Sequence, residues 1–225
     1  GSDGVARGRF PIVAPISPPG TDASVRMSTR QPNLVPSVGF LTVVDSGGGS
    51  FLGGYLVLNA SGRPLEFQCT APVKANRAQE ILYGPTLHPY LWGEQIGGAL
   101  ISKSRTRPLF VCTDQPHTLA VRAAVDLPVI QVLPAAKQSG GAPSQHNITT
   151  TSNTESAEQP PAERLILGRY VCALSRSHLT DRVIVERAWK THLDDLHLRE
   201  PFERIREAIT EAQRTAAGPA SGAAA

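Results

Sequence analysis

The sequence predicts an α/β (α+β) fold: a mixed sheet that starts with a three-stranded antiparallel meander, continues through a β-helix-β crossover, and carries C-terminal helices packed on it. Two observations favour this fold. Short apolar runs rich in β-branched and aromatic residues alternate with runs of helical periodicity throughout residues 39–133. Residues 134–163 are instead rich in Ser, Thr, Gly, Pro, Asn and Gln, a composition typical of disorder.

These segments predict one domain, formed by residues 38–133 and 164–214. Residues 134–163 are expected to be a disordered insertion inside that domain rather than a linker between two domains, because an apolar run beyond them can supply a further strand to the same sheet. An ordered loop of this length would be unusual in a compact domain.

Both ends of the chain are expected to lie outside the domain. Residues 1–37 predict a disordered or extended arm, in which Gly1 and Ser2 are interpreted as the remnant of a purification tag, and residues 215–225 predict a disordered tail. No apolar run reaches the roughly 18 residues of a membrane-spanning helix, and no secretion signal opens the chain. We therefore expect a cytoplasmic protein without a membrane partner.

The meander is predicted from three consecutive strands at residues 38–44, 51–58 and 63–70. The turn sequence DSGGGS separates the first two strands, and Gly53-Gly54 in the second strand marks a bulge or a close approach of another backbone. The third strand alternates apolar and polar residues. One face of the meander is therefore expected to be buried.

Helices are predicted to follow the meander. Asn76 is a suitable N-cap for a short helix that ends at Tyr83. A second helix is expected from Thr86 to about residue 102, and its interior contains Gly93, Gly97 and Gly98. Each glycine costs about 1 kcal/mol relative to alanine in a helix interior. The sequence therefore favours tight packing of this helix on the sheet.

The crossover is predicted from two short apolar runs, residues 108–113 and 128–133, on either side of a segment of helical character at 117–125. This is the pattern of two parallel strands joined by a helix. Residues 165–175 are expected to add one more strand, and residues 181–196 and 200–214 to form two helices.

The last helix carries an apolar stripe that includes Phe202, Ile205 and Ile209. The stripe can either dock on the sheet or bind a partner, and both alternatives remain open from the sequence.

The three cysteines, Cys69, Cys112 and Cys172, have neither zinc-site spacing nor the pattern of a disulfide framework. Each lies in an apolar run, where a free cysteine behaves as a small buried apolar group, so reduced thiols in a cytoplasm fit best. A catalytic role for Cys112 is the minor alternative. The histidines form no HxH or HExxH group, so we predict no metal ligands and no cofactor.

Three carboxylates are weak candidates for catalysis. Asp114 follows a predicted parallel strand, where ligands of open α/β sheets bind, but it is also a good helix N-cap before Pro116. Asp45, together with Glu66 and its neighbour Gln68, has the residue types of a divalent-metal site on adjacent strands. The favoured interpretation of this second group is polar residues on an exposed sheet face.

The net charge of +3 is spread evenly along the chain, which argues against the concentrated basic face typical of nucleic-acid-binding proteins. The best local candidate for binding nucleic acid is Lys103, Arg105 and Arg107, although no aromatic residues lie between them to stack on bases.

Because no catalytic motif stands out, the sequence favours a non-catalytic protein-interaction module: a subunit or adaptor of a larger cytoplasmic assembly with a protein partner. Two alternatives remain. The chain can be a metal-dependent hydrolase or nuclease that uses Asp45, Glu66 or Asp114, or a nucleic-acid-binding accessory protein that uses the basic residues at 103–107.

Overall fold

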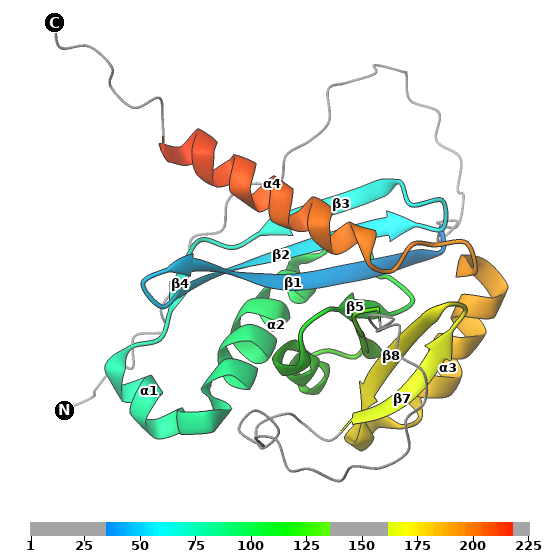
Figure 1. The fold of residues 1–225 in the computed structure, drawn as a ribbon, viewed down its shortest axis with the longest axis horizontal. Helices are drawn as coiled ribbons and strands as arrows, with labels where there is room; N and C mark the ends of the chain where they lie inside the picture. The colour runs from blue at the N-terminus through cyan, green and yellow to red at the C-terminus, as the bar shows by residue number, and fades with distance from the viewer. Residues whose placement is uncertain (1–34, 136–161, 218–225) are drawn as a thin grey trace, which may run out of the picture.

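The computed structural model of the chain, which describes residues 35–135 and 162–217, contains an eight-stranded mixed sheet with helices on both faces (Figure 1). The strand order is β3-β2-β1-β5-β6-β8-β7, and β4 pairs with β2. The predicted α+β fold is therefore confirmed.

The predicted arm, insertion and tail lie almost wholly outside the described residues. No helix in the described part of the chain is long and apolar enough to cross a membrane.

The strands are β1 (Ser37–Gly47), β2 (Ser50–Asn59), β3 (Pro64–Cys69), β4 (Val73–Lys74), β5 (Val111–Thr113), β6 (Val129–Val132), β7 (Ala162–Leu167) and β8 (Tyr170–Ser175). The α-helices are α1 (Arg77–Tyr83), α2 (Gly98–Lys103), α3 (Asp181–Ala188) and α4 (Glu200–Ala217). Shorter helices are the 3-10 helices η1 (Gly84–Thr86), η3 (Pro116–Ala123) and η4 (Arg176–His178), and the π-helices η2 (Pro89–Gly97) and η5 (Trp189–Leu193).

The meander β1-β2-β3 forms as predicted, with both neighbouring pairs antiparallel. It differs from the prediction in its burial, because β1 is covered on both faces. Phe40 faces a cluster made with α3, η5 and α4, whereas the next residue, Leu41, faces a second cluster made with η2, α2 and η3. Burial on both faces explains why β1 is a continuous apolar run rather than an alternating one.

The predicted crossover is also present. β5 is parallel to β1 and to β6, and the connection from β5 to β6 is the 3-10 helix η3. The glycines of η2 permit the close packing that the sequence predicts, although Gly93 approaches η3 rather than the sheet: a Cβ at this position would lie 2.8 Å from the backbone nitrogen of Val121.

Residues 165–175 differ most clearly from the prediction of a single strand. They form most of the antiparallel hairpin β7-β8, which turns at Gly168. Gly168 has φ +55°, in the left-handed region that favours glycine, and this residue makes the tight reversal possible.

An ion pair joins the two helical layers. The carboxylate of Asp181, at the start of α3, receives hydrogen bonds from Arg122 Nε at 2.7 Å and from its terminal nitrogen at 3.2 Å. Arg122 also donates to the Val125 carbonyl oxygen at 3.0 Å. This two-pronged contact fixes η3, and therefore the segment that leaves β5, against α3.

Candidate functional site at the carboxyl ends of β1 and β5

The chain leaves the parallel neighbours β1 and β5 in opposite directions. β1 turns back into β2 on one side, whereas β5 leads through η3 into β6 on the other. Open α/β sheets bind ligands at such a switch point, beyond the carboxyl ends of the strands. The residue that follows β5 at this point is Asp114.

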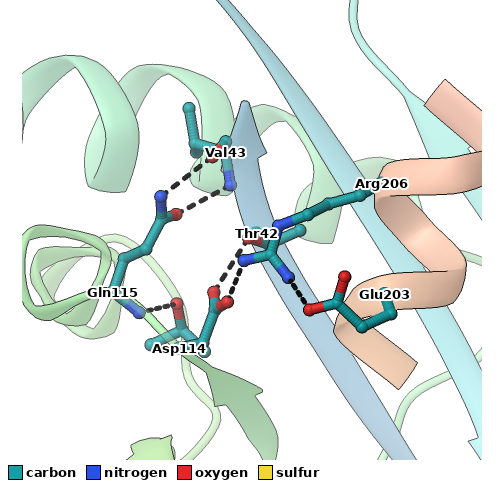
Figure 2. Close-up of polar contacts among 7 residues, drawn as sticks. Thr42, Val43, Asp114, Gln115, Glu203 and Arg206 are labelled. Atoms are coloured by element: carbon teal, nitrogen blue, oxygen red, sulfur yellow. Dashed lines mark hydrogen bonds and ion pairs between the residues drawn. The ribbon is translucent and has the colours of Figure 1, made fainter. Parts of the chain in front are cut away.

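Asp114 directs its carboxylate toward β1 and α4 (Figure 2). One oxygen accepts a hydrogen bond of 2.8 Å from the hydroxyl of Thr42, a fully buried residue in the middle of β1. The other oxygen forms an ion pair with Arg206 of α4. Capping of η3 is therefore not the role of this side chain, because the N-cap residue of η3 is Gln115.

Arg206 joins two carboxylates. While one terminal nitrogen contacts Asp114, the other donates to Glu203 at 2.8 Å, so both acidic groups converge on one guanidinium (Figure 2). The side chain of Asp114 is 21% exposed and that of Arg206 35%, which leaves the cluster open to solvent on one side.

α4 is held over this point by its apolar stripe. Phe202, Ile205 and Ile209 are buried, and Phe202 packs edge-to-face on Phe40 with ring centroids 5.6 Å apart. Gly54 makes room for the helix, since a Cβ there would lie 2.3 Å from Ile205. The stripe docks on the sheet, so these three residues, named from the sequence as candidate binding residues, are not accessible to a partner.

Gln115 fixes the backbone next to Asp114. Its side-chain amide accepts a hydrogen bond from the Val43 nitrogen and donates one to the Val43 carbonyl oxygen, each at 2.8 Å (Figure 2). The pairing of β1 with β5 ends at Leu41 and Thr113, and this side chain continues it by the same pattern of donor and acceptor.

The other two candidate carboxylates lie elsewhere. Asp45 accepts a hydrogen bond of 2.7 Å from the Gly47 nitrogen and stabilises the β1-β2 turn. Glu66 accepts from the backbone nitrogens of Arg105 and Thr106 at 3.1 and 2.9 Å, so it anchors the loop after α2. Partial burial by itself would raise the pKa of Glu66, but these hydrogen bonds outweigh it and lower the pKa below its ordinary value. The structure does not bring the three candidates together.

The basic candidates lie near that loop. Lys103, Arg105 and Arg107 are exposed, and Arg107 donates to the carbonyl oxygen of Asp126 at 3.1 Å. Their role in binding nucleic acid stays a prediction.

The cysteines are poor nucleophiles. Burial raises the pKa of Cys172 to about 12 and also raises that of Cys112, so both favour the thiol form. Within residues 35–135 and 162–217, no group of three or more His, Cys, Asp and Glu side chains is arranged to hold a metal ion.

Sequence reasoning missed Thr42, Gln115, Glu203 and Arg206. One signal was present: Arg206 lies four residues after Phe202 and three before Ile209, so it occupies the apolar stripe of α4. A charged residue inside an apolar stripe indicates a specific partner on the surface that the helix covers.

No family model matches the sequence, and no curated protein matches it. Among solved structures, the chain is similar to endonuclease V. The enzyme of Ciona intestinalis, in complex with a 24mer DNA containing an inosine followed by a ribo-adenosine, is 13% identical, with 82% of this chain and 90% of that chain covered and a TM-score of 0.40. Human endonuclease V is 11% identical, with 81% and 89% covered and a TM-score of 0.37.

This finding contradicts the prediction of a non-catalytic adaptor or complex subunit, because the matching structures are those of a nuclease. The prediction is therefore wrong. That prediction depended only on the absence of known catalytic motifs. The fold nevertheless brings together a polar site that no sequence motif indicates. At these identities and TM-scores, the matches transfer neither an activity nor any residue's role to this chain, which has to be judged by its own site.

Proposed function

We propose that the protein is a metal-dependent hydrolase of phosphodiesters, a nuclease, whose site is the carboxyl end of β1 and β5. The observation that supports this proposal is the convergence of Asp114 and Glu203, from separate elements, on one positive charge at a topological switch point. The two carboxylates that pair with this guanidinium are oxygen ligands of the kind that a divalent cation such as Mg²⁺ prefers.

The residues fit a magnesium or manganese ion of the kind that phosphoryl-transfer enzymes use. Such an ion is bound through one or two carboxylates, and waters and substrate phosphates complete its coordination. Asp114 and Glu203 would hold the ion, with the Thr42 hydroxyl keeping Asp114 in place. When bound, the ion would supply charge stabilisation to the phosphoryl oxygens and lower the pKa of a bound water.

Arg206 has a second use in this proposal. A guanidinium binds phosphate oxygens through parallel N–H groups, and it is strongly suited to a phosphodiester. In the free protein its one positive charge pairs with both Asp114 and Glu203 and offsets part of their negative charge. With substrate and metal present, the same side chain can turn from the carboxylates to the phosphate, so that the positive charge is kept at the site throughout.

The test is cleavage of fluorescently labelled single-stranded and duplex oligonucleotides with Mg²⁺ or Mn²⁺, together with calorimetric titration of each metal. We expect Asp114→Asn to lower metal-dependent cleavage at least about a hundredfold, a loss in the range found when one group that stabilises transition-state charge is removed. Asp45→Asn is the matched control, because its carboxylate serves only the β1-β2 turn. Cleavage that persists in Asp114→Asn, or a wild-type protein that cleaves neither substrate, would refute the proposal.

A further inference from the structure

A second polar cluster surrounds Tyr170, at the start of β8. Tyr170 is 3% exposed, and two guanidinium groups lie beside its ring: Arg169 at 5.2 Å and Arg199 at 5.3 Å from the ring centroid. Arg169 also donates to the Tyr170 hydroxyl at 3.1 Å, and His197 Nδ1 lies 3.3 Å from the same oxygen. We call Arg169, Tyr170, His197 and Arg199 the Tyr170 cluster.

His197 also contacts Arg169. Its Nε2 lies 2.5 Å from a terminal nitrogen of Arg169. Because a guanidinium can only donate, Nε2 is the acceptor in this contact. The histidine therefore orients Arg169 but does not neutralise its charge.

The cluster contains more donors than acceptors. Among the described residues, no carboxylate lies within ion-pair distance of Arg169 or Arg199. Arg199 donates from Nε to the Leu133 carbonyl oxygen at 3.1 Å. Each guanidinium has five N–H groups and no acceptor. The ligand that complements such a surface is an anion that only accepts, and phosphate is the common example with matching geometry.

The Tyr170 cluster lies on the same edge of the sheet as Asp114. Thr113, Gln131 and Ala173 form one row across β5, β6 and β8. Asp114 is one residue beyond this row, and Tyr170 is three residues beyond it in the same direction. From ordinary strand spacing and rise, the two backbones are about 12 Å apart. Arg199 and Arg206 are about 10 Å apart along the start of α4.

From this geometry we infer that the Tyr170 cluster is a binding site for a backbone phosphate of a nucleic acid, on the same strand as the phosphodiester at Asp114 and a short distance along it. The inference rests on the proposed function for its choice of polymer. It adds an anchoring site away from the reacting atoms, and it assigns Arg169 and Arg199 to binding and not to catalysis.

Binding without cleavage tests this inference separately. Fluorescence anisotropy of a labelled single-stranded 20mer is measured in EDTA, so that no metal-dependent reaction occurs. We expect Arg169→Gln and Arg199→Gln each to weaken binding about tenfold, the loss that follows from one charge-assisted hydrogen bond. The double variant should reduce the slope of log affinity against log salt by about 1.4, the value for two phosphate contacts on a single strand.

Controls separate binding from folding and from the catalytic proposal. Arg187→Gln removes an exposed arginine of α3 that lies outside the Tyr170 cluster, and it should leave affinity unchanged within about twofold. Arg199→Lys keeps the charge and should retain part of the affinity if a phosphate is bound. Inorganic pyrophosphate should displace the labelled 20mer from wild type and from Arg187→Gln at lower concentrations than from the double variant. Displacement at the same concentration from all three proteins would argue against a specific anion site.

The outcomes are distinguishable. If Arg169→Gln and Arg199→Gln, folded by circular dichroism, bind the 20mer as wild type does, or if wild type does not bind it, the inference is overturned. If both weaken binding while wild type cleaves nothing, the phosphate site stands and the nuclease proposal fails.

Discussion

Removal of one partner of the Arg122–Asp181 ion pair should destabilise the fold strongly. The Asp181 side chain is 3% exposed and that of Arg122 is 19% exposed, and two hydrogen bonds join them. Breaking a buried pair of this kind costs about 3–5 kcal/mol, because it leaves a buried charge without a partner. The two single variants should nevertheless differ.

Arg122→Met leaves the deeply buried carboxylate of Asp181 without this partner and should cost about 4–5 kcal/mol. Asp181→Leu leaves the guanidinium of Arg122, which still donates to Val125 and reaches water, so about 3 kcal/mol is expected. The double variant replaces the pair by apolar groups and should be less destabilised than the sum of the singles by about 2–3 kcal/mol.

Urea denaturation followed by tryptophan fluorescence measures the free energy of unfolding of wild type, the two single variants and the double variant. Trp92 packs near η3, with its ring 5.6 Å from that of His117, and Trp189 follows α3 directly, so each side of the ion pair has a reporter. Arg187→Met on the exposed face of α3 is the control. Single variants that each cost under about 1 kcal/mol, or a double variant that equals their sum, would refute the reasoning.

Three further predictions follow from the packing and charges. Arg206→Ala should increase Mg²⁺ affinity about tenfold in calorimetry, because it removes the cation that competes for Asp114; unchanged or weaker affinity contradicts this. Gly54→Ala should destabilise the fold by about 1–3 kcal/mol in urea, since its Cβ would clash with Ile205, and a neutral effect would mean that α4 is free to shift. The lowered pKa of Glu66 means that its contribution to stability is present above its ordinary pKa of 4.5 and is lost as pH falls through the folded value, so Glu66→Gln should flatten the acid limb of stability against pH. An acid limb identical to that of wild type would show that the loop at 104–106 does not depend on this carboxylate.

The sequence by itself determined the order and type of most elements. The apolar runs of β1 and β2, the crossover from β5 to β6 and the stripe of α4 all follow from local periodicity, which the chain shows wherever a face must be buried. Glycine positions also predicted close contacts, as at Gly93. Local signals failed where two structures share one sequence pattern. Residues 165–175 suit a single strand as well as a hairpin, and the left-handed backbone conformation of Gly168 makes them part of a hairpin.

The site was decided only by the tertiary structure. Asp114 suited a helix cap in sequence, and its actual partners, Thr42 and Arg206, lie 72 and 92 residues away along the chain. Likewise, Arg169 and Arg199 meet at Tyr170 because a hairpin and the start of α4 are packed together, which no spacing in the sequence expresses. Periodicity reports which side of an element is buried, but it carries no information on which distant charges the packing brings into contact.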